Sequence, residues 1–113
     1  WPGALTIIIP VAEEKKFCTT SLDFTLGLRI PNSKMVKSLI TDTGPLLTSS
    51  ANISGVRGSI TAEEIALDMP NVYILGPIPW EKCSGSGSTI ISWVKRGYWR
   101  LIRSGEISIE GVQ

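Results

Sequence analysis

The heptapeptide Leu5-Thr6-Ile7-Ile8-Ile9-Pro10-Val11 indicates the fold of this 113-residue chain. It is apolar and β-branched almost throughout, which predicts a central strand that is buried on both faces. A second strand is expected from Thr25 to Ile30, where Pro31 closes it. Such strands alternate with helical segments along the chain, so an α/β layer structure with a mostly buried sheet is expected.

Two helices are expected between the strands. The first follows a cap at Asn32 or Ser33, and its apolar residues fall on one face. The second begins in a capping box, Thr61-Ala62-Glu63-Glu64, with the flanking isoleucines placed as a hydrophobic staple. This second helix is expected to run to about Asp68, because Pro70 follows.

Four further strands are predicted, with a loop from Gly76 to Gly87. They are Pro45–Thr48, Val72–Leu75, Ile90–Val94 and Trp99–Ile102. The last two flank a turn at Lys95-Arg96-Gly97, which predicts a hairpin.

Composition limits the classes of function. Hydrophobic residues make up 42% and charged residues 19% of the chain, as in an ordinary globular domain, and a net charge of +1 does not support a strongly basic nucleic-acid binder. No apolar run is long enough to span a bilayer, so no membrane partner is expected. The chain has no histidine and no P-loop motif, which excludes histidine-based nucleophilic catalysis and an ordinary P-loop site for this chain alone.

The two cysteines give little functional signal. Cys18 and Cys83 lack the paired spacing of a zinc site. They could form one disulfide, but free buried thiols in a reducing cytosol are the simpler interpretation.

A segment rich in hydroxyl and amide side chains follows the apolar start of the predicted strand at Pro45. It reads Thr48-Ser49-Ser50-Ala51-Asn52-Ile53-Ser54-Gly55. Short donors held close to the backbone suit phosphate or carboxylate oxygens. A polar turn after a buried strand is the simpler alternative. Thr48, Ser50 and Asn52 alternate, so they would share one face if the extended conformation continued.

Five motifs occur in a fixed order, and together they resemble the YrdC-like family. They are Trp1-Pro2-Gly3-Ala4-Leu5-Thr6, Thr25-Leu26-Gly27-Leu28-Arg29-Ile30-Pro31, Ser50-Ala51-Asn52-Ile53-Ser54-Gly55, Gly87-Ser88-Thr89-Ile90-Ile91 and Leu101-Ile102-Arg103-Ser104-Gly105. Family versions typically read W-P-G-P-L-T, V-x-V-R-x-P, S-A-N-x-S-G, x-S-T-V and L-R-P-G. The resemblance runs from Trp1 to about Ser108.

The resemblance implies a twisted mixed sheet with flanking helices and a concave active face. Family domains begin with a further stretch that carries a Y-P-T-D-T-type strand and a Lys-x-Arg motif at the triphosphate. We therefore expect residues 1–113 to be the C-terminal part of a single YrdC-like domain whose N-terminal portion is missing. Such a part would hold only one side of the nucleotide and would be inactive alone.

The best-known family members are L-threonylcarbamoyladenylate synthases, which are nucleotidyltransferases. The resemblance implies that L-threonine, bicarbonate and ATP are joined to give threonylcarbamoyl-AMP and pyrophosphate, with Mg²⁺ on the phosphates. The product serves the threonylcarbamoyladenosine modification of tRNA in the cytoplasm, so tRNA or tRNA-modification proteins are possible partners.

Three residues match family positions at the L-threonine substrate. They are Arg29, Thr48 and Ser88. Arg29 ends an apolar strand, and its planar fork suits a carboxylate; a structural salt bridge is the alternative. Without the resemblance, Ser84 to Ser88 would be interpreted as a flexible linker.

Five residues match family positions at the nucleotide. They are Thr25, Ser50, Asn52, Ser59 and Arg103. The loop from Val56 to Ser59 is one residue longer than in many relatives, which affects the match of Ser59. Ser104 replaces the proline of L-R-P-G, so the turn after Arg103 is expected to be less rigid. No catalytic or metal-ligating residue is assigned.

Two other functions compete with this interpretation. Lys95, Arg96, Tyr98, Trp99 and Arg100 could bind RNA by charge and stacking in a non-catalytic module, although a charged hairpin turn explains them more simply. A YrdC-like domain of a hydrogenase-maturation carbamoyltransferase is the second alternative. A zinc-finger or acylphosphatase segment would indicate it, and this sequence contains neither.

Overall fold

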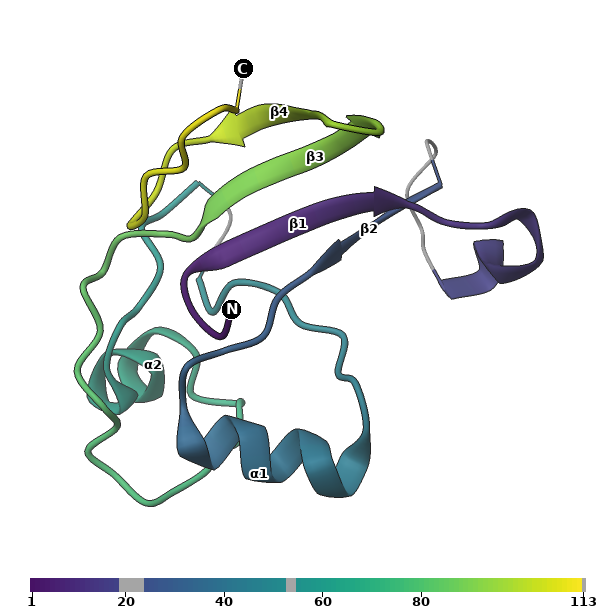
Figure 1. Ribbon diagram of the computed structural model, residues 1–113. Helices are drawn as coiled ribbons and strands as arrows, with labels where there is room; N and C mark the ends of the chain where they lie inside the picture. The colour runs from purple at the N-terminus through teal and green to yellow at the C-terminus, as the bar shows by residue number, and fades with distance from the viewer. Residues whose placement is uncertain (19–23, 53–54, 113) are drawn as a thin grey trace. The chain divides into compact units, whose positions relative to one another are not determined.

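The computed structural model describes residues 1–18, 24–52 and 55–112. These residues form two compact units, which are described separately below (Figure 1). The first unit consists of Trp1–Leu39 together with Ser86–Gln113, and the second of Ile40–Gly85.

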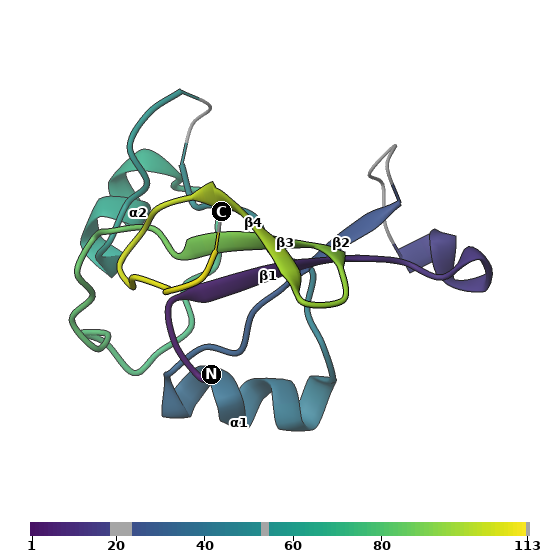
Figure 2. The same cartoon turned by 45° about the horizontal axis from the view of Figure 1, so that its top comes forward.

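The first unit contains a mixed sheet of four strands in the described residues. The strands are β1 (Leu5–Pro10), β2 (Thr25–Leu28), β3 (Thr89–Lys95) and β4 (Tyr98–Arg103), in the order β2-β1-β3-β4. β1 and β3 are parallel, and both outer pairs are antiparallel. β1 and β3 run side by side in the middle of the sheet (Figures 1 and 2). The predicted central position of β1 and the predicted mixed α/β fold are therefore confirmed.

The register gives this sheet one apolar and one more polar face. Ile7 lies opposite Leu28 on one side and Ile91 on the other, so these side chains share a face. Thr6 and its neighbour Ile90 point to the opposite face.

Burial in β1 is less complete than the sequence predicts. Leu5 to Ile9 are half-buried, and of the large aliphatic side chains in the described strands only Ile91 is buried. A β-branched run favours strand conformation through its packing against neighbouring strands, and this does not require both faces to be covered.

The β3–β4 hairpin agrees with its predicted turn. Arg96 and Gly97 form the turn, and Gly97 has a φ of +74°, which a residue without a Cβ adopts readily. Trp93 and Trp99 face each other across the two strands.

Both predicted helices form at their predicted caps. α1 spans Lys34–Thr43, and the Val36 amide donates to Ser33 Oγ over 3.4 Å, so Ser33 is the N-cap. α2 spans Ala62–Asp68, where the Glu64 amide donates to Thr61 Oγ1 (3.1 Å) and the Thr61 amide to Glu64 Oε2 (3.3 Å). This reciprocal pair is the capping box expected from the sequence. A short 3-10 helix, η1 (Glu13–Cys18), lies between β1 and β2 in the chain.

Two predicted strands of the second unit are absent from its described residues. Pro45–Thr48 and Val72–Leu75 have no ladder partner and are irregular. Leu47 is 94% exposed and Tyr73 is fully exposed. A short apolar run becomes a strand only where another strand can take up its backbone hydrogen bonds, and propensity alone does not supply one.

Thr89 ties the start of β3 to two distant segments. Its side chain is 2% exposed, its amide donates to the Ala4 carbonyl (2.9 Å), and its hydroxyl donates to the Ile107 carbonyl. The Gly105 amide donates to the same hydroxyl oxygen over 3.1 Å. The segment after β4 is thereby fastened against the segment that enters β3.

Gly105 can lie there only because it lacks a side chain. A Cβ on Gly105 would overlap the main chain of Gly87, Ser88 and Thr89. Backbone atoms cannot move aside as the end of a flexible side chain can, so any larger residue must push the two segments apart.

We predict that Gly105→Ala lowers the free energy of unfolding of the intact protein by about 1–3 kcal/mol, because it overpacks this junction. Gly58→Ala is the matched control, since a Cβ there meets no atom within 4 Å. Chemical denaturation followed by circular dichroism measures both. Equal stability of the two variants would contradict the described junction.

Candidate substrate-binding face

Two residues, Thr6 and Arg103, form hydrogen bonds with Ser88, which immediately precedes β3. Its Oγ lies 2.8 Å from Thr6 Oγ1, and its carbonyl accepts from Arg103 Nη2 (2.8 Å) and Nε (3.2 Å). Arg103 Nη2 also lies 3.4 Å from Ser88 Oγ. Ser88 is only 7% exposed, so the flexible-linker alternative is wrong for this residue. The structure therefore brings two predicted site residues, Ser88 and Arg103, into direct contact.

Gly87 makes room for the arginine. A Cβ at Gly87 would lie 2.8 Å from Arg103 Nη2 and 3.1 Å from Cζ. The guanidinium thus rests against the main chain just before Ser88. The turn that follows Arg103 is held by the bond from Gly105 to Thr89, which restrains a turn that lacks the family proline.

Arg29 is exposed at the end of the β2 segment. Its Nε donates to the Gly3 carbonyl over 3.1 Å, and the Gly3 amide donates to the Ile30 carbonyl over 2.9 Å. Among the described residues no carboxylate forms an ion pair with Arg29, so the salt-bridge alternative gains no support there. Burying an unpaired arginine would be costly, but this cost does not arise here because the Arg29 side chain is exposed. Thr25 begins β2 opposite Pro10.

The hydroxyl-rich loop belongs to the second unit and does not continue as an extended strand. The Asn52 amide donates to the Ser50 carbonyl (3.1 Å), so the chain turns at Ala51. Asn52 Nδ2 donates to the Val56 carbonyl over 2.8 Å, which closes the loop on itself. The alternation that would place Thr48, Ser50 and Asn52 on one face is therefore wrong. Thr48 and Ser50 are exposed.

Ser59 has a different local environment from the one a phosphate contact suggests. Its hydroxyl donates to Asp68 Oδ2 over 2.9 Å, and both residues line a shallow hollow with Arg57 and Glu64. Two carboxylates repel phosphate, whereas Arg57 attracts it. The nucleotide contact of Ser59 stays a prediction.

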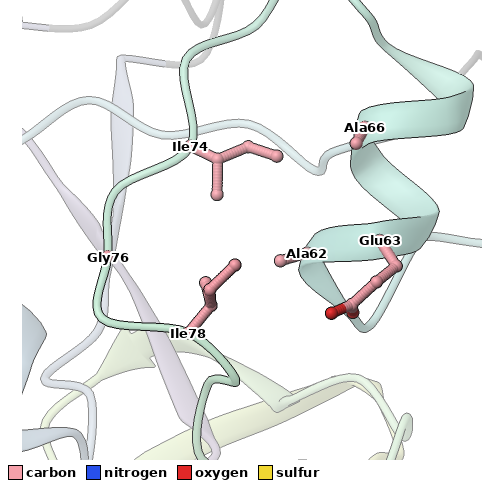
Figure 3. Close-up of a pocket in the computed structure, with 6 residues that line it drawn as sticks. All are labelled: Ala62, Glu63, Ala66, Ile74, Gly76 and Ile78. Carbon is pink, nitrogen blue, oxygen red and sulfur yellow. The ribbon is translucent and has the colours of Figure 1, made fainter.

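A second hollow of the second unit contains none of the predicted site residues in its lining. It measures about 280 Å³ between α2 and the segment that follows it (Figure 3). Its lining is Ala62, Glu63, Ala66, Ile74, Gly76 and Ile78. With a single carboxylate and otherwise apolar walls, this hollow does not suit a polyphosphate.

The basic side chains of the hairpin are accessible. Lys95, Arg96 and Arg100 are exposed, while Tyr98 and Trp99 are half-buried. The turn itself is confirmed, and RNA binding by this cluster stays a prediction.

The part of the chain that the structure describes gives no support for a metal site, and none of its helices could span a membrane. It contains no group of three or more histidine, cysteine, aspartate or glutamate residues that could hold a metal. Cys83 is a free thiol, but it is exposed, so its expected burial is wrong; the side chain of Cys18 lies outside the described residues. None of the described helices has the length and hydropathy that a bilayer crossing requires.

Comparison with known proteins identifies the family. The Sua5/YciO/YrdC family model, described as "Telomere recombination", matches residues 1–105. The chain belongs to the Sua5/YciO/YrdC family. A Mycobacterium tuberculosis protein provisionally named as a threonylcarbamoyl-AMP synthase is 30% identical over 99% of this chain and 51% of its own length. A Yersinia pestis threonylcarbamoyl-AMP synthase is 34% identical over 66% of this chain and 40% of its own length.

Solved structures of a family member share the fold. A doubly substituted variant of P. abyssi Sua5 matches 97% of this chain and 34% of its own, with a TM-score of 0.79 and 30% identity. P. abyssi Sua5 complexed with L-threonine matches 93% of this chain and 31% of its own, with a TM-score of 0.74 and 32% identity. The chain thus spans about half the length of the first curated relative and about a third of these solved chains.

The sequence alone does not predict the contact of Thr6 with Ser88. The only signal is a hydroxyl side chain inside an otherwise apolar strand, at the last position of the first family motif. Its partner Ser88 is 82 residues away in the chain, and only the parallel pairing of β1 with β3 brings them together.

We predict that Gly87→Ala displaces the Arg103 guanidinium from the Ser88 carbonyl. The expected cost is about 0.5–1.5 kcal/mol of unfolding free energy, the net value of such hydrogen bonds. In an Arg103→Ala background the same change should cost nothing, because no guanidinium remains to be displaced. Denaturation of the four proteins of this cycle measures the difference, and an equal cost in both backgrounds would contradict the contact.

Proposed function

We propose that the intact protein is an L-threonylcarbamoyladenylate synthase. Membership of the family, the names of its relatives and the threonine complex of P. abyssi Sua5 support this proposal. The observation that carries it in this chain is the exposed Arg29, whose guanidinium forms no ion pair within the described residues. A cation of this kind is available for a carboxylate ligand.

L-Threonine is the proposed amino-acid substrate. Arginine presents a planar fork that can bind a carboxylate through two hydrogen bonds. In Arg29 the Nε donor is directed to the Gly3 carbonyl, which restrains the side chain and leaves its terminal nitrogens for a ligand. Thr48 and Ser88 are proposed as further contacts on the threonine side.

The proposed reaction depends on alignment more than on proton transfer. Bicarbonate and the threonine nitrogen form a carbamate with loss of water. A carbamate oxygen then attacks the α-phosphorus of ATP in line, the bond from that phosphorus to the bridging β-phosphate oxygen breaks, and pyrophosphate leaves. Holding the reactants and neutralising the phosphate charge can supply most of the acceleration for such a step. A chain without histidine can perform these tasks with arginine, hydroxyl and amide groups.

Thr25, Ser50, Asn52, Ser59 and Arg103 are proposed on the nucleotide side. Their side chains are hydroxyl, amide and guanidinium groups, which suit phosphate and ribose oxygens. Mg²⁺ usually keeps several waters and binds substrate phosphates together with few protein ligands. The carboxylate-free set in this chain fits a metal ion that ATP brings with it, and Mg²⁺ would add charge neutralisation at the phosphates.

The proposed product is an activated intermediate for the threonylcarbamoyladenosine modification of tRNA. We therefore propose that the protein works in the cytoplasm, beside the tRNA-modification proteins that would use the product.

Arg29→Ala in the intact protein should raise the threonine concentration needed for pyrophosphate release by roughly ten- to a hundredfold. Losing a charge-assisted hydrogen-bonded pair costs about 1.5–3 kcal/mol, which corresponds to that range. A coupled pyrophosphate assay, run with and without bicarbonate and L-threonine, measures the effect.

Arg96→Ala is the matched control, because Arg96 is an exposed arginine at the hairpin turn. It should leave the threonine requirement unchanged. Normal threonine kinetics in a folded Arg29→Ala variant would remove Arg29 from the site. Pyrophosphate release that needs neither threonine nor bicarbonate would contradict the proposed reaction.

A further inference from the structure

The two branches of the Thr6 side chain point toward different segments of the sheet unit. Its hydroxyl lies 2.8 Å from Ser88 Oγ, at the start of β3. Its methyl group faces β2, where a Cβ on Gly27 would lie 3.6 Å from Thr6 Cγ2. A β-branched side chain has few χ1 rotamers, and this one places the hydroxyl oxygen beside Ser88 and the methyl group toward β2.

The hydrogen-bonding capacity of Ser88 shows why it matters which of the two hydroxyls donates to the other. A serine hydroxyl has one proton to donate and two lone pairs to accept with. Arg103 Nη2 can use one lone pair, at 3.4 Å. If Thr6 donates to the other lone pair, both are filled and the Ser88 proton is left to point elsewhere. If Ser88 donates to Thr6, no proton remains for a ligand.

We propose that Thr6 is a positioning residue that donates its hydroxyl proton to Ser88 and so turns the Ser88 proton toward an oxygen of the amino-acid substrate. This rests on the proposed function, because it takes L-threonine as the ligand. Thr6 itself does not touch the substrate; it acts through Ser88. The Arg103 bonds to the Ser88 carbonyl hold the main chain in place while Thr6 sets the hydroxyl.

A merely structural role for Thr6 makes a different prediction. A bond between β1 and β3 that only fastens the sheet would affect stability and leave substrate binding unchanged. The positioning role changes the KM for threonine, and only when Ser88 carries its hydroxyl.

The test is a double-mutant cycle in the intact protein with Thr6→Val, Ser88→Ala and the combined variant. Valine keeps the shape of threonine, including the methyl group that points toward Gly27, but it has no hydroxyl. We expect Thr6→Val to raise the KM for L-threonine roughly three- to tenfold, the range of one hydrogen bond, and to change kcat less. Added to Ser88→Ala, it should raise the KM no further. Thr6→Ser, which keeps the hydroxyl, should restore most of the affinity.

Several results would overturn the proposal. An equal effect of Thr6→Val in both backgrounds would show that Thr6 does not act through Ser88. A Thr6→Ser variant as impaired as Thr6→Val would show that the Thr6 hydroxyl alone does not account for the effect. Calorimetric titration of the wild type with L-threonine separates the proposed function from the positioning role of Thr6. If a folded wild type does not bind L-threonine, both are overturned. If it binds L-threonine but the effects of the two substitutions are additive, only the positioning role is overturned.

Discussion

The buried hydroxyl of Thr89 joins the parts of the sheet unit that are farthest apart in the chain. It connects the first residue of β3 to the segment after β4, while the Thr89 amide connects β3 to the segment before β1. A buried polar group that lost these partners would carry its full desolvation cost, so the three segments are held together by more than apolar contact. Ser88 and Arg103 lie within one residue and two residues of this junction, and their relative position depends on it.

The neighbourhood of that junction is suited to binding and poorly suited to acid–base chemistry. Its side chains are two hydroxyls and a guanidinium, Thr6, Ser88 and Arg103, linked by hydrogen bonds. Such groups donate to anionic oxygens and hold them in place. This agrees with the proposed reaction, in which carbamate, carboxylate and phosphate oxygens must be aligned and their charge offset.

Local chemistry made parts of the fold predictable. The capping box at Thr61 and the turn at Gly97 depend on residues a few positions apart, and both form as expected. The supposed strands at Pro45–Thr48 and Val72–Leu75 failed because a strand needs a partner, and partners are a property of the whole fold.

The candidate site was also predictable only in part. Matching to family motifs identified Ser88 and Arg103, and the structure brings them into contact. Thr6 also stands in a family motif, but its contact with Ser88 follows from the pairing of β1 with β3, which residues so distant in sequence do not reveal. The expected shared face of Thr48, Ser50 and Asn52 failed because a single main-chain hydrogen bond turns the chain at Ala51.

Substrate binding at the segments around Ser88, Arg103 and Arg29 can be measured by hydrogen–deuterium exchange of the intact protein, with and without L-threonine, ATP and Mg²⁺. If these segments bind the substrates, exchange slows in the peptides that cover Thr25–Ile30, Gly87–Thr89 and Leu101–Gly105, and it does not change at the exposed hairpin turn, Arg96–Gly97. Slower exchange confined to the hairpin turn or to the α2 hollow, with those three segments unchanged, would contradict substrate binding there.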